Sequence, residues 1–188
     1  MERDFLGLSS KESAVQFDLP DEVCFAIQNV ELQAGADTMR FVRVVHPPIE
    51  GSTDASFFTS RNNTPDDTPD YLPDGFVMRT HNLGVVVPLW TLQVEILSYP
   101  SIRGFLTHSG WNSSLESIVH GVPMIAWPLY VEQRLNAALL TEELHVAVRL
   151  RELPTKEVVG REEIERMVRT VIQSKEGKMV RERVKELK

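Results

Sequence analysis

The chain contains little cysteine and no long apolar run. Cys24 is the only cysteine among 188 residues, which excludes an internal disulfide and a cysteine-based zinc site. No apolar stretch reaches the roughly 18 residues that a membrane-spanning helix needs. The opening MERDFLGLSS lacks the apolar core of a signal peptide, so a cytoplasmic location is expected. Because the sequence also lacks an H-E-x-x-H pattern, we expect no metal.

The sequence also lacks an excess of basic residues. Lysine and arginine number 20 against 27 aspartates and glutamates, which gives a formal net charge of −7. Nucleic-acid binding requires a concentrated basic surface. The basic residues near the end of the chain alternate with Glu176, Glu182 and Glu186, as on a solvated helix face. A nucleic-acid partner is therefore not expected.

The first part of the chain has a weaker pattern than the rest. The spacing of apolar residues predicts a helix within 20–32, and the β-branched and aromatic residues of 39–45 predict a strand. Residues 47–75 are polar and rich in proline, which indicates a long surface loop. We therefore expect a divergent, partly helical segment at 1–38 and a domain at 39–188.

A regular alternation of strands and helices follows. Strands are predicted at 84–90, 104–108, 121–127 and 146–150, and helices at 92–98, 112–120, 132–144, 161–174 and 177–187. Short apolar strands that alternate with helices are typical of a parallel sheet covered on both faces. The expected fold class is therefore α/β.

The stretch FLTHSGWNSSLE, residues 105–116, lies where a predicted strand meets a predicted helix. In open parallel sheets, ligands bind beyond the carboxyl ends of the strands, where the N-terminus of the next helix favours an anion. Gly110 lets the backbone approach a ligand closely, and His108 can donate to a phosphate oxygen. Asn112 and Ser113 supply further donors. This stretch predicts a phosphate site.

Glu116 belongs to the same stretch but suits a different group. A carboxylate would repel a phosphate, so it fits the hydroxyls of a sugar. An alternative interpretation needs no ligand, because Ser113 and Glu116 also match an S-x-x-E capping box. On this stretch alone, capping and phosphate binding are about equally supported. His108 is also compatible with a structural role, and Trp111 with core packing.

A second group of residues lies at neighbouring strand ends. Trp90 and Trp127 end two predicted strands, and Glu132 and Gln133 follow Trp127 at the next helix opening. Aromatic rings can stack on a base, and a carboxylate beside an amide can bind vicinal hydroxyls. The alternative for Glu132 and Gln133 is an ordinary polar first turn of a helix. Taken together, the two groups predict a nucleotide-sugar site.

The segment from Trp90 to Gln133, 44 residues in all, strongly resembles the signature box of plant secondary-product UDP-glycosyltransferases. The flanking YLPDGFVMRT and RLNAALLTEELHVAVRL are similar to the same family. The residue pattern as a whole is similar to that of the branch that glucosylates small phenols such as hydroquinone. The resemblance extends from Arg40 to Lys188. It implies a GT-B fold of two Rossmann-like domains, of which this chain would supply the C-terminal, donor-binding one.

The resemblance also implies how a UDP-sugar is held at its nucleoside end. Trp90 should stack on the uracil, and the backbone of Thr91 should meet the edge of the base. Gln93 and Glu116 should hold the ribose.

The diphosphate and the hexose are assigned from the same resemblance. Trp111, Glu132 and Gln133 should contact the sugar, and a terminal glutamine in the box favours UDP-glucose over UDP-galactose. The residues that should hold the diphosphate are His108, Asn112 and Ser113, beside the close backbone approach at Gly110.

The sequence departs from the family pattern at several positions. Thr91 and Leu92 replace Ala-Pro, which is expected to loosen this loop because proline fixes φ. Tyr99 stands in place of histidine, and Ser109 in place of cysteine. The family's donor domain opens with a strand and a Gly/Ser turn, and residues 1–19 contain nothing similar.

No catalytic residue is assigned in this chain. The family's general base is a histidine near the start of the N-terminal domain, supported by an aspartate, and His46, His81, His120 and His145 stand in different contexts. An acceptor hydroxyl needs such a base as it attacks. We therefore expect a UDP-glucose-dependent glycosyltransferase, present here as its donor-binding half and nearly inactive alone.

The expected reaction is inverting O-glucosyl transfer to a small phenolic or alcohol acceptor, with UDP-glucose as donor substrate and no cofactor. The alternative is a non-catalytic UDP-sugar-binding module. A UDP-sugar epimerase on a related fold is a third hypothesis, which the signature box disfavours.

Overall fold

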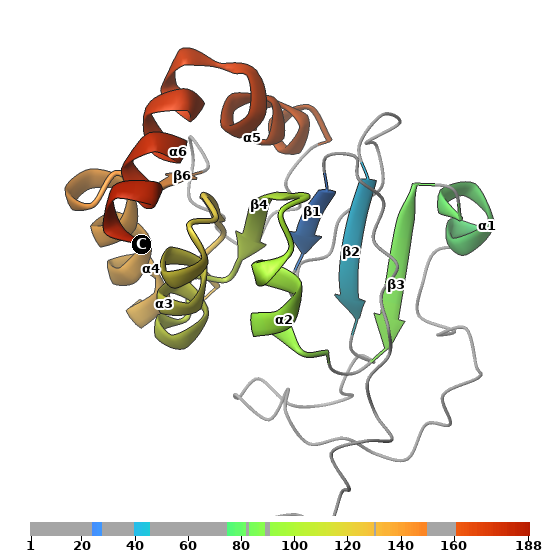
Figure 1. Cartoon of the computed structure of the whole chain (residues 1–188). Coiled ribbons are helices and arrows are strands. Elements are labelled where there is room, and N and C mark those ends of the chain that lie inside the picture. The colour runs from blue at the N-terminus through green and yellow to red at the C-terminus, as the bar shows by residue number, and fades with distance from the viewer. Residues whose placement is uncertain are drawn as a thin grey trace, which may run out of the picture.

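The computed structural model describes residues 24–27, 40–45, 75–81, 83–88, 91–129, 131–149 and 161–188 (Figure 1). The strands are β1 (Cys24–Ile27), β2 (Arg40–Val45), β3 (Gly84–Pro88), β4 (Ile102–Thr107), β5 (Met124–Ala126) and β6 (Ala147–Arg149). The helices are α1 (Phe76–Thr80), α2 (Gln93–Ser98), α3 (Trp111–His120), α4 (Val131–Ala138), α5 (Arg161–Gln173) and α6 (Lys175–Leu187), and α4 continues as a π-helix, η2 (Leu139–Glu143). The alternation expected from residue 84 onward is confirmed.

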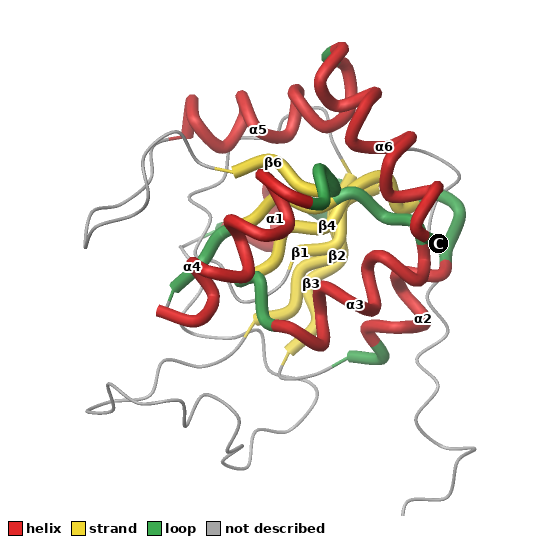
Figure 2. The backbone as a smooth tube through the Cα atoms, turned by 90° about the vertical axis from the view of Figure 1, so that its left-hand side faces the viewer, coloured by secondary structure: helices red, strands yellow, loops and turns green. Residues whose placement is uncertain are grey.

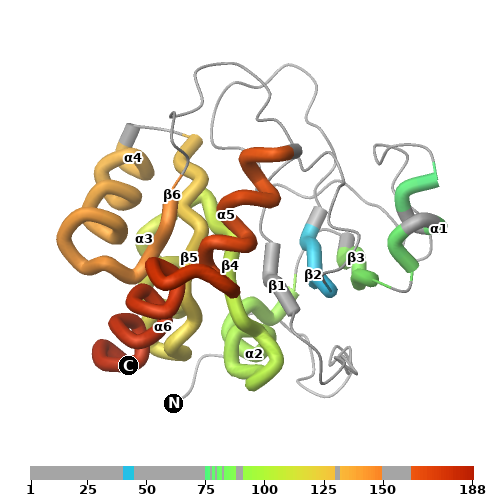
Figure 3. The backbone as a smooth tube through the Cα atoms, turned by 90° about the horizontal axis from the view of Figure 1, so that it is seen from above, coloured from blue at the N-terminus to red at the C-terminus, as the bar shows by residue number. Residues whose placement is uncertain are grey.

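All six strands form one parallel sheet, in the order β3-β2-β1-β4-β5-β6. Figure 3 shows this order across the molecule, with α1 beyond the β3 edge. The order reverses between β1 and β4, since β2 and β3 continue to one side and β5 and β6 to the other. This is the doubly wound order in which a ligand-binding crevice lies at the reversal, beyond the carboxyl ends of the strands.

Adjacent residues of the central strands β4 and β5 pack into different cores, which is why these strands contain consecutive apolar residues. Phe105 of β4 belongs to a core formed with α2, α3 and α4, whereas the next residue, Leu106, packs against α5 and α6. Met124 and Ile125 of β5 divide in the same way. Figure 2 shows α5 and α6 on one side of the strands and α2 and α3 on the other. The expected α/β fold with helices on both faces is confirmed.

The helix expected within 20–32 is wrong for the described residues of that range, because Cys24–Ile27 is strand β1. β1 pairs with β2 on one edge and β4 on the other, so it lies at the centre of the sheet. A short, continuous apolar run suits a buried strand and a buried helix equally, and periodicity does not separate them. The sheet therefore includes residues from the 1–38 segment that the sequence suggested was divergent.

Two further expectations concern the stretch before β3. The long loop expected at 47–75 lies outside the described residues except for Gly75, which precedes α1 with a φ of 69°. Helix α1 itself was not predicted. Phe76 of α1 is buried and packs against the partly buried Phe41 of β2, with ring centroids 6.4 Å apart, so this aromatic contact anchors α1 to the sheet.

The N-termini of helices α2, α3 and α4 follow from the carboxyl edge of the sheet. In Figure 1 the arrowheads of β1, β2 and β3 point to the lower edge, where α2 begins. α3 follows directly after β4, and α4 follows β5. In the part of the chain that the structure describes, no helix is both long and apolar enough to cross a membrane.

We predict that Gly177→Ala lowers the stability of the fold. A Cβ built at Gly177 on α6 would lie 1.9 Å from the carbonyl oxygen of Thr170 and 2.6 Å from that of Val171 on α5, so the two helices would have to separate. Alanine normally stabilises a helix interior by about 1 kcal/mol relative to glycine. Overpacking costs roughly 1–3 kcal/mol, and contact with fixed backbone atoms places this site at the upper end.

Thermal unfolding followed by circular dichroism measures the effect. Lys178→Ala, at the neighbouring exposed position on α6, is the control and should change the unfolding temperature little, because its ion pair with Glu182 is exposed and 3.7 Å long. An unchanged or higher unfolding temperature for Gly177→Ala would contradict the close packing of α5 and α6.

Candidate functional site

The turn between β4 and α3 is short and closely packed. His108, Ser109 and Gly110 connect the last residue of β4 to the first residue of α3. A Cβ at Gly110 would lie 2.3 Å from Nε2 of His108, so the imidazole ring occupies the space that any other residue at position 110 would need. Ser109 has a φ of 65° and is fully buried. The ring of His108 therefore packs directly against the backbone at Gly110, and the close approach of a ligand expected there stays a prediction.

His108 is half-buried beside a carboxylate from another helix. Burial lowers its pKa below the ordinary value of 6.5, while the charge of Glu132 on α4 opposes that shift. The imidazole is therefore mainly neutral near pH 7, with one N–H to donate. The electrostatic effect of Glu132 also shows that the openings of α3 and α4 are close enough to interact.

The N-terminus of α3 carries no side-chain cap. Gly110 is its N-cap, it has no side chain to accept a hydrogen bond from the first-turn N–H groups, and no acidic residue lies in the first turn. The capping-box alternative is therefore wrong, because Ser113 is the third residue of the helix and not its cap. Uncapped backbone N–H groups at a helix N-terminus favour an anion. Asn112 is exposed at this end, and Trp111 is 50% exposed.

Gln93 joins α2 to α3. Its side-chain amide donates to Glu116 Oε2 at 2.6 Å and to Ser113 Oγ at 3.2 Å, across a sequence separation of at least 20 residues. The structure therefore brings together Gln93 and Glu116, the two residues assigned to the ribose, and places Ser113 beside them. The side-chain oxygen of Gln93 and the carboxylate oxygens of Glu116 are hydrogen-bond acceptors, and a hydroxyl group can donate to such atoms.

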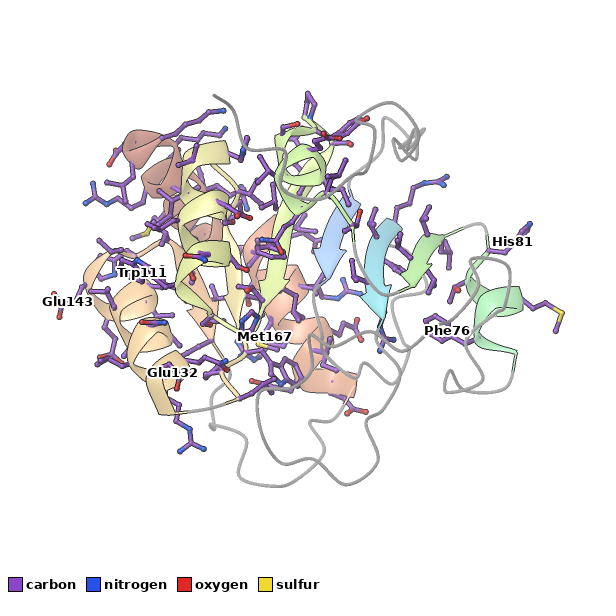
Figure 4. All side chains as sticks on the ribbon, turned by 90° about the horizontal axis from the view of Figure 1, so that it is seen from below. Phe76, His81, Trp111, Glu132, Glu143 and Met167 are labelled. Atoms are coloured by element: carbon purple, nitrogen blue, oxygen red, sulfur yellow. The ribbon has the colours of Figure 1, made fainter. Side chains whose placement is uncertain are left out.

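The two polar residues at the N-terminus of α4, which were both expected to contact the sugar, differ in exposure. Glu132 is exposed, whereas Gln133 is 7% exposed, and its Oε1 accepts a hydrogen bond from the backbone N–H of Leu129 at 2.8 Å. Gln133 therefore shapes the turn before α4. Figure 4, seen from the carboxyl edge, shows Trp111 on α3 and Glu132 on α4 in the same half of the molecule, with Phe76 and His81 in the other half.

Trp90, Thr91 and Trp127 are the residues that the sequence suggested for contact with the base. Trp90 lies outside the described residues. Thr91 is half-buried, and its Oγ1 is buried without a hydrogen-bond partner among the described residues. Trp127 is 6% exposed and packs into the core beneath α5 and α6, so it is not available as a base platform.

Sequence reasoning missed one residue of this region. The side-chain amide of Asn136 on α4 donates to the carbonyl oxygen of Ser109 at 3.0 Å. Asn136 lies one helical turn after Glu132, so the helical spacing alone places both on one face of α4. No spacing rule links Asn136 to Ser109, which is 27 residues away.

The described residues contain no group of three or more histidine, cysteine, aspartate or glutamate side chains arranged to hold a metal ion.

The strand order, with its reversal between β1 and β4, defines a doubly wound, Rossmann-like parallel α/β domain. The family model of UDP-glucoronosyl and UDP-glucosyl transferase matches residues 73–186, and the chain belongs to this family.

Individual relatives agree. The chain is 50% identical over 188 residues to an anthocyanidin 3-O-glucosyltransferase 5 of Manihot esculenta, covering 98% of this chain and 38% of the relative. The crystal structure of TcCGT1 in complex with UDP matches with a TM-score of 0.76 and 49% identity, covering 89% of this chain and 38% of that one. A UGT transferase from Siraitia grosvenorii in complex with UDP matches with a TM-score of 0.69 and 33% identity, covering 90% and 38%. The chain thus spans little more than a third of these proteins and corresponds to their C-terminal part.

We predict opposite stability effects for two buried serines. Ser109 and Ser117 are both fully buried, but Ser109 Oγ has no partner among the described residues, whereas Ser117 Oγ donates to the carbonyl oxygen of Val122 at 2.8 Å. A buried polar group without a partner costs about 1–3 kcal/mol, and a buried hydrogen bond contributes about 1 kcal/mol. Ser109→Ala should therefore raise the free energy of unfolding by about 1 kcal/mol, and Ser117→Ala should lower it by a similar amount.

Denaturant titration of the two variants measures both effects, and each variant is the other's matched control. Equal destabilisation by both substitutions would contradict the prediction, because it would mean that the Ser109 hydroxyl is hydrogen-bonded in the folded chain.

We predict that Glu132→Gln lowers the pKa of His108 further. The carboxylate favours the imidazolium, so its removal leaves the burial effect unopposed. Because the folded-state pKa is below the ordinary 6.5, the unfolded chain binds this proton more readily. His108 therefore makes the fold less stable as the pH falls from 6.5 through its folded pKa, and Glu132→Gln extends that loss to lower pH.

NMR titration of the His108 ring measures the shift. Glu142→Gln, which removes another carboxylate of the α4–η2 segment without a role at His108, should leave the pKa of His108 as it is in the unsubstituted chain. A pKa that is unchanged or higher in Glu132→Gln would rule out the electrostatic effect of Glu132 on His108.

Proposed function

We propose that this chain binds the UDP-glucose donor for an inverting O-glucosyl transfer to a small phenolic or alcohol acceptor. The observation that carries the proposal is the cluster of Gln93, Ser113 and Glu116 beside an uncapped helix at the reversal point of the sheet. Family membership and the two similar structures solved with UDP support it. UDP-glucose enters as a substrate, and the proposal includes no cofactor. A cytoplasmic location remains an expectation from the sequence.

In this proposal the ribose lies on the cluster between α2 and α3. Glu116 accepts from a ribose hydroxyl, and the amide of Gln93, which already donates to Glu116, keeps the carboxylate oriented. A charge-assisted hydrogen bond to a carboxylate is about twice as strong as a neutral one. The base would lie further along, toward Thr91, and Trp90 is expected from the sequence to stack on it.

The diphosphate lies at the N-terminus of α3 in this proposal. The backbone N–H groups after Gly110, the side chains of Asn112 and Ser113, and the N–H of a neutral His108 are donors directed at one anion. In the transfer step, a bond forms between the acceptor oxygen and the anomeric carbon while the bond from that carbon to the diphosphate breaks. UDP leaves with the electron pair, and the proton of the acceptor hydroxyl passes to a general base outside these residues. Charge then increases on the diphosphate, so these donors stabilise the transition state more than the ground state.

The hexose is assigned to the openings of α3 and α4. Trp111 and Glu132 are exposed there, and Gln133 is held by Leu129 in the turn that leads into α4. We place the glucose hydroxyls on Glu132 and Gln133, and this is also where discrimination between glucose and galactose would arise.

A non-catalytic UDP-sugar-binding module is the second candidate function. It requires only a donor site, and the cluster of Gln93, Ser113 and Glu116 would hold the donor with or without transfer. Assay of the purified chain with UDP-glucose and a phenol separates the two candidates. We expect UDP binding with negligible transfer by these 188 residues alone, and transfer when a relative's acceptor-binding part is supplied. Binding without transfer under both conditions would favour the module, and robust turnover by the chain alone would contradict this division of roles.

We predict saturable binding of UDP and UDP-glucose in a calorimetric titration, and weaker binding after Glu116→Ala. Loss of a charge-assisted hydrogen bond of about 1.5–3 kcal/mol corresponds to a roughly 10- to 100-fold decrease in affinity. The matched control is Glu95→Ala, which removes an exposed carboxylate from α2 and should leave the affinity unchanged. Absence of UDP binding by the folded chain would refute the proposed function.

A further inference from the structure

Asn136 connects two helix openings that the proposed function assigns to different parts of the donor. It lies on α4, one turn after Glu132, and its Nδ2 donates to the carbonyl oxygen of Ser109 at 3.0 Å. Ser109 lies between His108 and Gly110 in the turn before α3. The hydrogen bond therefore joins the helix that carries the sugar-binding residues to the turn that carries the diphosphate-binding residues.

Ser109 needs external support because its backbone conformation is unfavourable. A φ of 65° lies in the left-handed region, which residues other than glycine seldom adopt unless the surrounding structure holds them there. Two contacts provide this support: the backbone N–H of Ser109 donates to Thr107 Oγ1 at 3.3 Å, and its carbonyl oxygen accepts from Asn136. The first contact comes from the same strand, whereas the second ties Ser109 to helix α4.

The position of His108 follows from this turn. The ring lies so close to the Cα of Gly110 that a Cβ there would be 2.3 Å from Nε2. Rotation of the peptide between Ser109 and Gly110 would therefore move the ring and the first N–H groups of α3 together. The orientation of the Ser109–Gly110 peptide therefore determines where the His108 ring and the first N–H groups of α3 lie.

We propose that Asn136 is a positioning residue: it fixes the Ser109–Gly110 peptide and thereby sets the donors of the diphosphate site relative to the opening of α4. The inference rests on the proposed function. Asn136 touches neither the nucleoside nor the diphosphate in this arrangement. Its loss should therefore reduce the part of the affinity that the diphosphate contributes and leave the nucleoside contribution unchanged.

The test compares uridine with UDP on the full 188-residue chain and on Asn136→Ala and Asn136→Leu. Leucine matches asparagine in size but has no donor, so it separates the hydrogen bond from packing. Loss of one hydrogen bond should reduce the UDP affinity about tenfold, with uridine affinity unchanged, as measured by NMR titration. The resonances of the His108 ring should also shift in both variants, which a general loss of stability would not cause in the folded chain.

Thr141→Val is the matched control, because Thr141 Oγ1 donates to the carbonyl oxygen of Ala137 at 2.8 Å at the end of the same helix, away from the turn. It should lower the unfolding temperature slightly and leave the affinities for UDP and uridine unchanged. If the unsubstituted chain does not bind UDP more tightly than uridine, the proposed function fails. If it does, and the Asn136 variants keep the same ratio of the two affinities, the positioning role of Asn136 is refuted while the proposed function stands.

Discussion

The three-residue turn from β4 into α3 is the constraint on which the rest of the site depends. Within His108, Ser109 and Gly110 the chain must leave a central strand and begin a helix at the carboxyl edge of the sheet. The left-handed conformation of Ser109 makes this reversal possible, and the absence of a side chain at Gly110 makes room for the His108 ring. A longer turn would displace the start of α3, and the contacts of α3 with Gln93 and of Ser109 with Asn136 would not form.

The part of the fold that could be predicted is the part where a local pattern has one interpretation. From β3 onward, short apolar runs alternate with amphipathic segments, and consecutive strand residues such as Phe105 and Leu106 must each find a separate core. Such a pattern permits little other than a parallel sheet between helices. β1 shows the limit, because its run CFAI suits either element, and its central position depends on pairing with β2 and β4.

The same limit applies to the site. That Gln93 and Glu116 lie together follows from the resemblance, but the choice between a capping box and a ligand site required knowing that α3 begins after Gly110. The bond from Asn136 to Ser109 spans 27 residues and depends on the lateral order of β4 and β5, which no local pattern encodes. Long-range hydrogen bonds of this kind are properties of the sheet topology and not of any segment.

Helix α3 also departs from the usual binary pattern, and the reason is its closeness to the sheet. Its buried residues are Ser113, Ser114 and Ser117, whereas Leu115 and Val119 are exposed. Small side chains let the helix approach β4, and their hydroxyls do not remain unpaired: Ser114 donates to the carbonyl oxygen of Gly110, and Ser117 to that of Val122. Packing of α2, α3 and α4 into one core places these helices side by side, but apolar contacts have no direction and tolerate small displacements. Hydrogen bonds are directional and short-ranged. The core therefore determines which helices meet at the carboxyl edge, and the hydrogen bonds from Gln93 and Asn136 fix the positions of these helices and of the turn relative to one another.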